Sequence, residues 1–158
     1  VYGWRRTKNC KLPDHFDAIV PSLQEAIDSA EIIFIALPAT TETENLISKE
    51  MLMSMKGKFL VNVGRGSIVN EEGLYEALKS GVLKGAAIDT WYTYPVTGVL
   101  GAPSRYPIHK LSNVVLSPHV GGSTNQASAR SIEDTVANIR SYLMTGRGIW
   151  KADLSKMY

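Results

Sequence analysis

Ionisable side chains and glycines directly follow several short apolar runs in this sequence. Arg65 comes after the run 59–63 and lies between Gly64 and Gly66. An arginine at such a place can clamp a carboxylate with its planar, bidentate fork. The flanking glycines would let the backbone approach a planar ligand closely. The alternative is a surface arginine in a flexible turn.

A histidine occupies a similar position later in the chain. His119 follows the apolar run 114–116 and precedes the glycine pair Gly121 and Gly122. Histidine is the usual proton carrier when a carbonyl and an alcohol interconvert near neutral pH. A hydrogen-bonding role without catalysis is the competing interpretation. The remaining histidines lack this setting and are expected at the surface: His15 and His109.

The elements that would position these residues follow from the apolar pattern, in which short apolar runs alternate with helix-length amphipathic segments. That alternation is typical of βα units around a parallel sheet. Strands are expected at 1–4, 31–37, 58–63, 85–89 and 114–116. Helices are expected at 22–30, 48–55, 70–79 and 125–145. The runs 31–37 and 58–63 suit strands buried on both faces, and the Pro-, Gly- and Tyr-rich stretch 92–112 predicts one long loop.

Local signals support several helix ends. Ser22 is the expected N-cap of the first helix, with Glu25 three residues later completing a capping box. Gly81 and Gly146 are the expected stops of the third and fourth helices.

Ligands of open α/β sheets bind beyond the carboxyl ends of the strands. Five expected strand ends carry a glycine, a proline or an ionisable group. These are Arg5-Arg6-Thr7, Leu37-Pro38, Gly64-Arg65-Gly66, Asp89 and 118–122. Together they predict one site, although any one of them alone would be weak evidence.

Composition excludes several classes of protein. A chain of 158 residues with 44% hydrophobic and 20% charged residues is ordinary for one globular domain. The net charge of +2, with scattered basic residues, gives no argument for nucleic acid. No apolar run approaches the length of a membrane span. The single cysteine, Cys10, excludes a disulfide framework and fits a reducing compartment. We expect a cytoplasmic protein and assign no metal ligand.

The motifs, taken in order, resemble those of the D-isomer-specific 2-hydroxyacid dehydrogenases, and the match covers nearly the whole chain. The segments that carry the resemblance are Ala30-Glu31-Ile32-Ile33, Leu37-Pro38-Ala39-Thr40, Thr43, the stretch 60–69 from Leu60 to Val69, Gly85-Ala86-Ala87-Ile88-Asp89, the stretch 113–119 ending in Ser117-Pro118-His119, and Gly121-Gly122.

The resemblance implies an α/β fold with a doubly wound parallel sheet, a Rossmann-like nucleotide-binding domain that is incomplete at its N-terminus. Residues 1–147 would form this domain without its first strand and glycine-rich loop. Residues 148–158 would be a tail returning to a substrate domain that is absent. A homodimer is the expected assembly.

Roles carry over residue by residue from the same resemblance. Arg65 would bind the substrate carboxylate and polarise the carbonyl, while His119 would be the general acid in reduction and the base in oxidation. Asp89 would hold the nicotinamide carboxamide. Further cofactor contacts are implied for Leu37, Pro38, Thr43, Val63, Gly64, Gly121 and Gly122.

Two departures from the family pattern affect the interpretation. After the strand at 1–4 an acidic residue usually binds the adenosine ribose of NAD, but this sequence has Arg5, Arg6 and Thr7. Two guanidinium groups and a hydroxyl suit a phosphate dianion. NADP(H) is therefore favoured over NAD(H), the alternative being that these arginines only line a solvated strand end.

The second departure concerns catalysis. The family usually places a glutamate before a proline, five residues after the nicotinamide aspartate, to orient and charge the histidine. Here Tyr94 takes that position before Pro95, and no glutamate occurs between Asp89 and His119. The related formate dehydrogenases have a neutral glutamine there, so loss of the carboxylate does not exclude hydride transfer.

The favoured function is an NADP(H)-dependent oxidoreductase that interconverts a small 2-oxoacid, such as glyoxylate or hydroxypyruvate, with its D-2-hydroxyacid. One alternative is a dinucleotide-sensing binding protein of the co-repressor type, which shares this fold. Another is an enzyme that acts on formate or another small anion.

Overall fold

The computed structural model describes residues 1–7, 11–95 and 101–152. They form two compact units, residues 1–118 and residues 119–158. Cys10, part of the predicted long loop (96–100) and the end of the predicted tail (153–158) lie outside the described residues.

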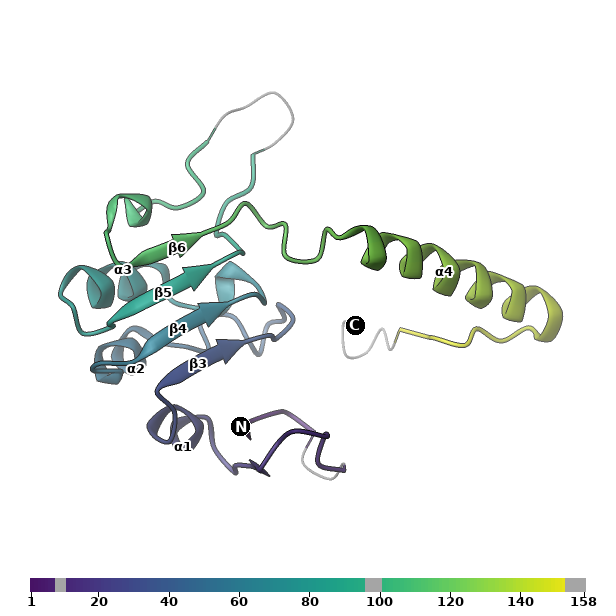
Figure 1. Ribbon diagram of the computed structural model, residues 1–158, viewed down its shortest axis with the longest axis horizontal. Helices are drawn as coiled ribbons and strands as arrows, with labels where there is room; N and C mark the ends of the chain where they lie inside the picture. Colours follow the sequence, from purple (N-terminus) through teal and green to yellow (C-terminus); the bar gives the residue numbers. More distant parts are fainter. Residues whose placement is uncertain (8–10, 96–100, 153–158) are drawn as a thin grey trace. The chain divides into compact units, whose positions relative to one another are not determined.

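A four-stranded parallel sheet organises the first unit. Its strands are β3 (Ile32–Ile35), β4 (Phe59–Asn62), β5 (Gly85–Ile88) and β6 (Val114–Leu116). They lie in the order β3-β4-β5-β6, with all neighbours parallel (Figure 1). Each strand falls within a range predicted from the apolar runs, so the predicted α/β class with a parallel sheet is confirmed.

Three helices accompany these strands. α1 (Leu23–Asp28) precedes β3, α2 (Lys49–Ser54) lies between β3 and β4, and α3 (Glu71–Lys79) lies between β4 and β5. A polar side chain caps the N-terminus of each helix by accepting a backbone N–H three residues later. The capping residues are Ser22, Ser48 and Asn70. Ser22 accepts the N–H of Glu25, as the capping signal predicts.

The hydrophobic core lies between these helices and one face of the sheet. Ile27 of α1, Leu52 of α2 and Leu74 of α3 are each at most 2% exposed. They belong to one buried cluster with side chains of the strands, among them Ile35, Leu60 and Ile88. Because each buried aliphatic side chain contributes roughly 1.5–3 kcal/mol, this layer supplies most of the unit's hydrophobic stabilisation.

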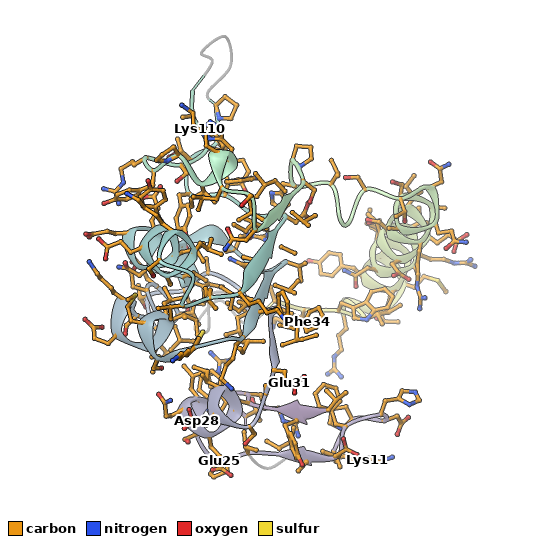
Figure 2. The ribbon with its side chains drawn as sticks, turned by 60° about the vertical axis from the view of Figure 1, so that its left-hand side comes forward. Lys11, Glu25, Asp28, Glu31, Phe34 and Lys110 are labelled. Atoms are coloured by element: carbon orange, nitrogen blue, oxygen red, sulfur yellow. The ribbon has the colours of Figure 1, made fainter. Side chains whose placement is uncertain are left out.

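The other face of the sheet is exposed, and here the prediction of strands buried on both faces is wrong for the described residues. Ile32, Phe34 and Val115 are 51%, 68% and 72% exposed. Successive right-handed crossovers that move in one direction along a sheet place all their helices on the same face. Figure 2 shows Phe34 on the side of the sheet turned away from those helices.

Some smaller elements were not predicted from the sequence. β1 (Tyr2–Gly3) lies within the strand expected at 1–4, but its parallel partner β2 (Ala18–Ile19), with which it forms a separate two-stranded sheet, was not expected. Two short 3₁₀ helices, η1 (Gly66–Ile68) and η2 (Ile108–Lys110), follow β4 and precede β6. The second of these lies within the segment predicted to be one irregular loop.

The second unit is built on α4 (Asn125–Thr145), as predicted, and Gly146 ends this helix with φ of +71°. No residue of α4 is buried. Beyond the helix the chain folds back, and the Asn138 side chain both donates to the Trp150 carbonyl and accepts its N–H, at 3.2 and 3.1 Å. Within the described part of the chain, no helix is both long and apolar enough to cross a membrane.

The one-sided core gives a direct stability prediction. Leu60→Ala removes a side chain that is 1% exposed and should lower the free energy of unfolding by about 2–5 kcal/mol. Val115→Ala, a truncation on the open face of the same sheet, should change it by only about 0.5 kcal/mol. Urea unfolding of the 158-residue chain would compare the two, and equal losses would contradict the assignment of the core to one face.

Candidate active site

The turn after β4 carries Arg65 and is held by the last residue of the strand. The Asn62 side chain is 3% exposed. Its Oδ1 accepts the N–H of Gly64 and its Nδ2 donates to the carbonyl of Arg65, both at 3.0 Å. The Arg65 residue is exposed, and its Nη1 donates to the Gly64 carbonyl at 2.7 Å. The backbone of the turn is therefore braced while the guanidinium group lies at the surface.

The two glycines of this turn are required by neighbouring backbone. A Cβ added to Gly64 would lie 2.7 Å from the Leu37 carbonyl oxygen, and one added to Gly66 would lie 2.3 Å from that of Trp91. The sequence suggested that these glycines admit a ligand, but the close approach that the structure shows is to protein. It brings the ends of β3, β4 and β5 together around Arg65.

Asp89 joins the ends of three strands. Its N–H donates to the carbonyl of Asn62 at 3.1 Å, and its Oδ1 accepts the Ser117 hydroxyl at 2.5 Å. The residue is 8% exposed. Trp91 Nε1 donates to the Ser117 carbonyl at 2.9 Å. A buried carboxylate is thus fixed at the strand ends between β4 and β6.

The loop after β3 is ordered by the Thr43 side chain. Thr43 Oγ1 donates to the Pro38 carbonyl at 2.7 Å and accepts the N–H of Thr40 at 2.8 Å. Leu37 is partly buried against the core, whereas Val63 at the end of β4 is 50% exposed. The ordered loop after β3 therefore lies beside an exposed apolar side chain at the end of β4.

One of the two arginines after β1 lies near this loop. Arg6 Nη1 lies 3.9 Å from Glu42 Oε2, with both side chains largely exposed. Arg5 Nη2 donates to the Lys11 carbonyl at 3.1 Å. Thr7 is exposed. Two guanidinium groups and a hydroxyl therefore follow β1, as the sequence suggested.

Tyr94 folds back onto the end of β5. Its hydroxyl oxygen accepts the N–H of Trp91 at 3.0 Å, and the residue is 46% exposed. Tyr94 is therefore placed in the same neighbourhood as Asp89 and the Arg65 turn.

A buried carboxylate anchors the loop that follows Tyr94. Glu71, at the first position of α3, is 5% exposed and accepts from the Ser104 hydroxyl, the Arg105 N–H and Arg105 Nε. Burial alone would raise the pKa of Glu71, but the hydrogen bonds from Arg105 and Ser104 outweigh it and hold the pKa below its ordinary value. Glu71 is therefore a carboxylate at neutral pH.

A polar cavity of about 410 Å³ adjoins this anchor. Tyr92 lines it, and the Tyr92 hydroxyl is buried with no hydrogen-bond partner among the described residues. Burial, followed by the charge of Glu71, raises the pKa of this phenol. Tyr92 is a neutral group in any reaction near neutral pH.

His119 belongs to the second unit and has an unusual backbone. Its φ is +59°, in the left-handed region that non-glycine residues rarely adopt. Such strain persists where surrounding structure enforces it, often at functional sites. Gly121 and Gly122 follow in the turn that leads to α4, where Ser123 N donates to the Val120 carbonyl at 2.9 Å. That these residues join Arg65 and Asp89 stays a prediction.

Two residues with a positioning role were not singled out from the sequence. Asn62 braces the Arg65 turn, and Ser117 binds Asp89 while its carbonyl accepts from Trp91. Each is a polar residue at the end of an otherwise apolar strand, a signal that could have marked both. His15 and His109 are exposed, as expected.

Comparison with known proteins agrees with this geometry. The chain is 35% identical over 127 residues to a glyoxylate/hydroxypyruvate reductase B from Pectobacterium carotovorum, covering 80% of this chain and 38% of the relative. It is 33% identical over 133 residues to a glyoxylate reductase from Thermofilum pendens, again covering 80% of this chain and 38% of the relative. The chain thus spans about two fifths of the length of these relatives.

A solved structure shows the same fold. The D-isomer-specific 2-hydroxyacid dehydrogenase from Xanthobacter autotrophicus Py2, in complex with NADPH and MES, matches with a TM-score of 0.77 and 26% identity, over 99% of this chain and 62% of the other. Residues 1–121 match the family model of the NAD-binding domain of D-isomer-specific 2-hydroxyacid dehydrogenases. With more than half of its length matched in this way, the chain belongs to the D-isomer-specific 2-hydroxyacid dehydrogenase family.

Proposed function

We propose that the full-length protein is an NADP(H)-dependent oxidoreductase that interconverts a small 2-oxoacid, of the glyoxylate or hydroxypyruvate type, with its D-2-hydroxyacid. The observation that carries the proposal is the junction of strand ends around the Arg65 turn, where an exposed guanidinium group and the buried Asp89 carboxylate are set on neighbouring strands. Two relatives named as glyoxylate reductases support the substrate class.

The residues present fit a nicotinamide dinucleotide. Asp89 supplies a carboxylate, fixed by Ser117, that can accept from a carboxamide N–H. Val63 supplies an exposed apolar surface at the end of the neighbouring strand. When bound, the cofactor supplies or accepts the hydride that changes the oxidation state of the substrate carbon.

The chain's own residues then have distinct tasks. Arg65 binds the substrate carboxylate with two parallel N–H···O bonds and polarises the carbonyl that is to be reduced. His119 donates a proton to the alkoxide oxygen during reduction and removes it during oxidation. Tyr94 takes the place of a carboxylate beside this proton carrier.

The preference for NADP(H) rests on Arg5, Arg6 and Thr7. The contact of Arg6 with Glu42 is long and solvent-exposed, and such pairs contribute about 0–1 kcal/mol. A phosphate dianion would therefore compete successfully for the same guanidinium group. The NADPH complex of the Xanthobacter autotrophicus protein supports a nicotinamide cofactor of this type.

The organisation of the whole protein is part of the same proposal. Residues 1–147 would form the nucleotide-binding domain, with its first strand and glycine-rich loop upstream, and 148–158 would lead back to a substrate domain. A cytoplasmic homodimer is the expected form of the protein.

Substitution of the carboxylate clamp tests the substrate class. Arg65→Lys keeps the charge but loses the planar fork, so it should raise KM for glyoxylate and lower kcat. Cofactor affinity should not change. Steady-state kinetics of the full-length protein, with Arg147→Lys at an exposed position as control, would measure this. Wild-type kinetics in Arg65→Lys would remove Arg65 from the substrate site.

Cofactor choice has its own test. Replacing Arg5 and Arg6 together with glutamine should raise KM for NADPH far more than KM for NADH, because each charge-assisted hydrogen bond to phosphate is worth roughly 1.5–3 kcal/mol. Glu42→Gln, which removes the competing carboxylate, should not raise KM for NADPH. An equal rise in both KM values, or no rise, would show that the arginines do not bind the phosphate.

The pH dependence of reduction tests the role of Tyr94. Reduction requires a charged imidazolium at His119, which a neighbouring carboxylate stabilises and a neutral phenol does not. In Tyr94→Glu, kcat/KM for reduction should therefore fall at higher pH than in the wild type, since this ratio reports the free enzyme. Tyr94→Phe, which adds no charge, is the control. Identical profiles in the wild type and Tyr94→Glu would mean that Tyr94 does not face His119.

A further inference from the structure

The loop that leaves β5 is tied to α3 by two separate contacts. Glu71 Oε1 accepts from Ser104 Oγ at 2.9 Å and from the Arg105 N–H at 2.7 Å, and Glu71 Oε2 accepts from Arg105 Nε at 2.7 Å. One helical turn later, the Tyr75 ring stacks on Tyr106 with centroids 5.3 Å apart. The returning arm of the loop is therefore docked along the first half of α3.

The buried hydrogen bonds to Glu71 stabilise this anchor more than its exposed ion pair with Arg105 does. The Arg105 side chain is 80% exposed, whereas that of Glu71 is 6% exposed. Solvent weakens the guanidinium contact. The bonds from Ser104 Oγ and the Arg105 N–H reach the same carboxylate oxygen, and Ser104 is 7% exposed. Removing the charge of Glu71 would leave buried donors with a poorer acceptor, which is costly.

The anchored arm in turn holds the outgoing arm. The carbonyl of Pro103, which precedes Ser104, accepts the N–H groups of Tyr92 and Thr93 at 3.2 and 3.0 Å. The next residue, Tyr94, returns its hydroxyl to the Trp91 N–H at 3.0 Å. A continuous series of hydrogen bonds and covalent neighbours thus runs from Glu71 to Tyr94.

The same segment bears on the Arg65 turn. The Trp91 carbonyl oxygen would lie 2.3 Å from a Cβ at Gly66, so the backbone of Trp91 lies directly against the turn. Trp91 also donates its indole N–H to Ser117, whose hydroxyl binds Asp89. A shift of the loop would therefore displace the surroundings of Arg65, Asp89 and Tyr94 together.

We propose that Glu71 is a positioning residue of the substrate site: by clamping Ser104 and Arg105 it fixes the segment Trp91–Tyr94 against the Arg65 turn. This inference rests on the proposed function. It assigns to Glu71 an effect on reactivity toward the 2-oxoacid that is separate from the adenosine side of the cofactor, whose candidate residues lie after β1 and β3.

The test uses Glu71→Gln in the full-length protein, with Glu72→Gln as a matched control. Both variants lose one carboxylate from the first turn of α3, but the Glu72 carboxylate is exposed and accepts a hydrogen bond from Lys49 at 3.1 Å. Glu71→Gln should raise KM for glyoxylate, lower kcat and reduce kcat/KM by about 10- to 100-fold, the range expected when reacting groups are misplaced by up to an ångström. The Kd of NADPH should be unchanged, and Glu72→Gln should behave as the wild type.

A second readout follows the loop without using activity. Hydrogen exchange at the amides of Tyr92, Thr93 and Arg105 should be faster in Glu71→Gln and unchanged in Glu72→Gln. Ser104→Ala removes one donor and keeps the carboxylate. It should also speed hydrogen exchange at these amides and lower kcat/KM, in both cases by less than Glu71→Gln does. Because this variant is milder, it keeps the test valid if Glu71→Gln folds poorly.

The possible results separate the two proposals. Faster exchange with unchanged kcat/KM, or equal losses of kcat/KM and NADPH binding, would overturn the positioning role and leave the proposed function intact. Wild-type protein that binds NADPH but turns over no 2-oxoacid would overturn the proposed function, and this inference with it.

Discussion

The site depends on a steric constraint at one turn. The Gly64-Arg65-Gly66 backbone passes so close to Leu37 on one side and Trp91 on the other that neither glycine position has room for a Cβ. Asn62, buried at the end of β4, forms hydrogen bonds with the Gly64 N–H and the Arg65 carbonyl, which this backbone path would otherwise leave without partners. A larger residue at either position would push neighbouring strand ends apart, and with them Asp89 and the loop that carries Tyr94. The position of the Arg65 backbone is thus fixed by close packing against neighbouring backbone segments.

Within residues 1–118, the described helices cover one face of the sheet that supplies these strand ends. Ile27, Leu52 and Leu74 bury one side, while Phe34 and Val115 stay exposed on the other. Parallel sheets are normally covered on both faces, and their strands are correspondingly apolar throughout. The apolar strand sequences therefore indicate a sheet that requires cover on both faces. The chain spans about two fifths of the length of its relatives.

Strands and helices with several apolar residues in period were predictable from the sequence, down to the caps at Ser22 and Gly146. β2, which is only two residues long, was not predicted. The meeting of strand ends followed from the general geometry of parallel sheets, so the position of Arg65 and Asp89 at neighbouring strand ends could be predicted. The anchor at Glu71 could not be found in this way, since its partners lie 33 and 34 residues away in a segment without periodicity. The same holds for the bond between Ser117 and Asp89, which depends on the register of β5 and β6.

Under the proposed function, Tyr94 in place of a carboxylate would change which state of a neighbouring histidine is favoured. A carboxylate only accepts hydrogen bonds and attracts positive charge, so it stabilises an imidazolium. The Tyr94 hydroxyl accepts the Trp91 N–H. A phenol, unlike a carboxylate, brings no negative charge that would stabilise an imidazolium beside it. In an active site where Tyr94 faces His119, this arrangement would favour the neutral ring, which is the form that removes a proton from an alcohol. The phenol would then shift the balance of the proton carrier toward oxidation at neutral pH, while reduction would depend more heavily on the charge of Arg65 to draw electron density from the carbonyl.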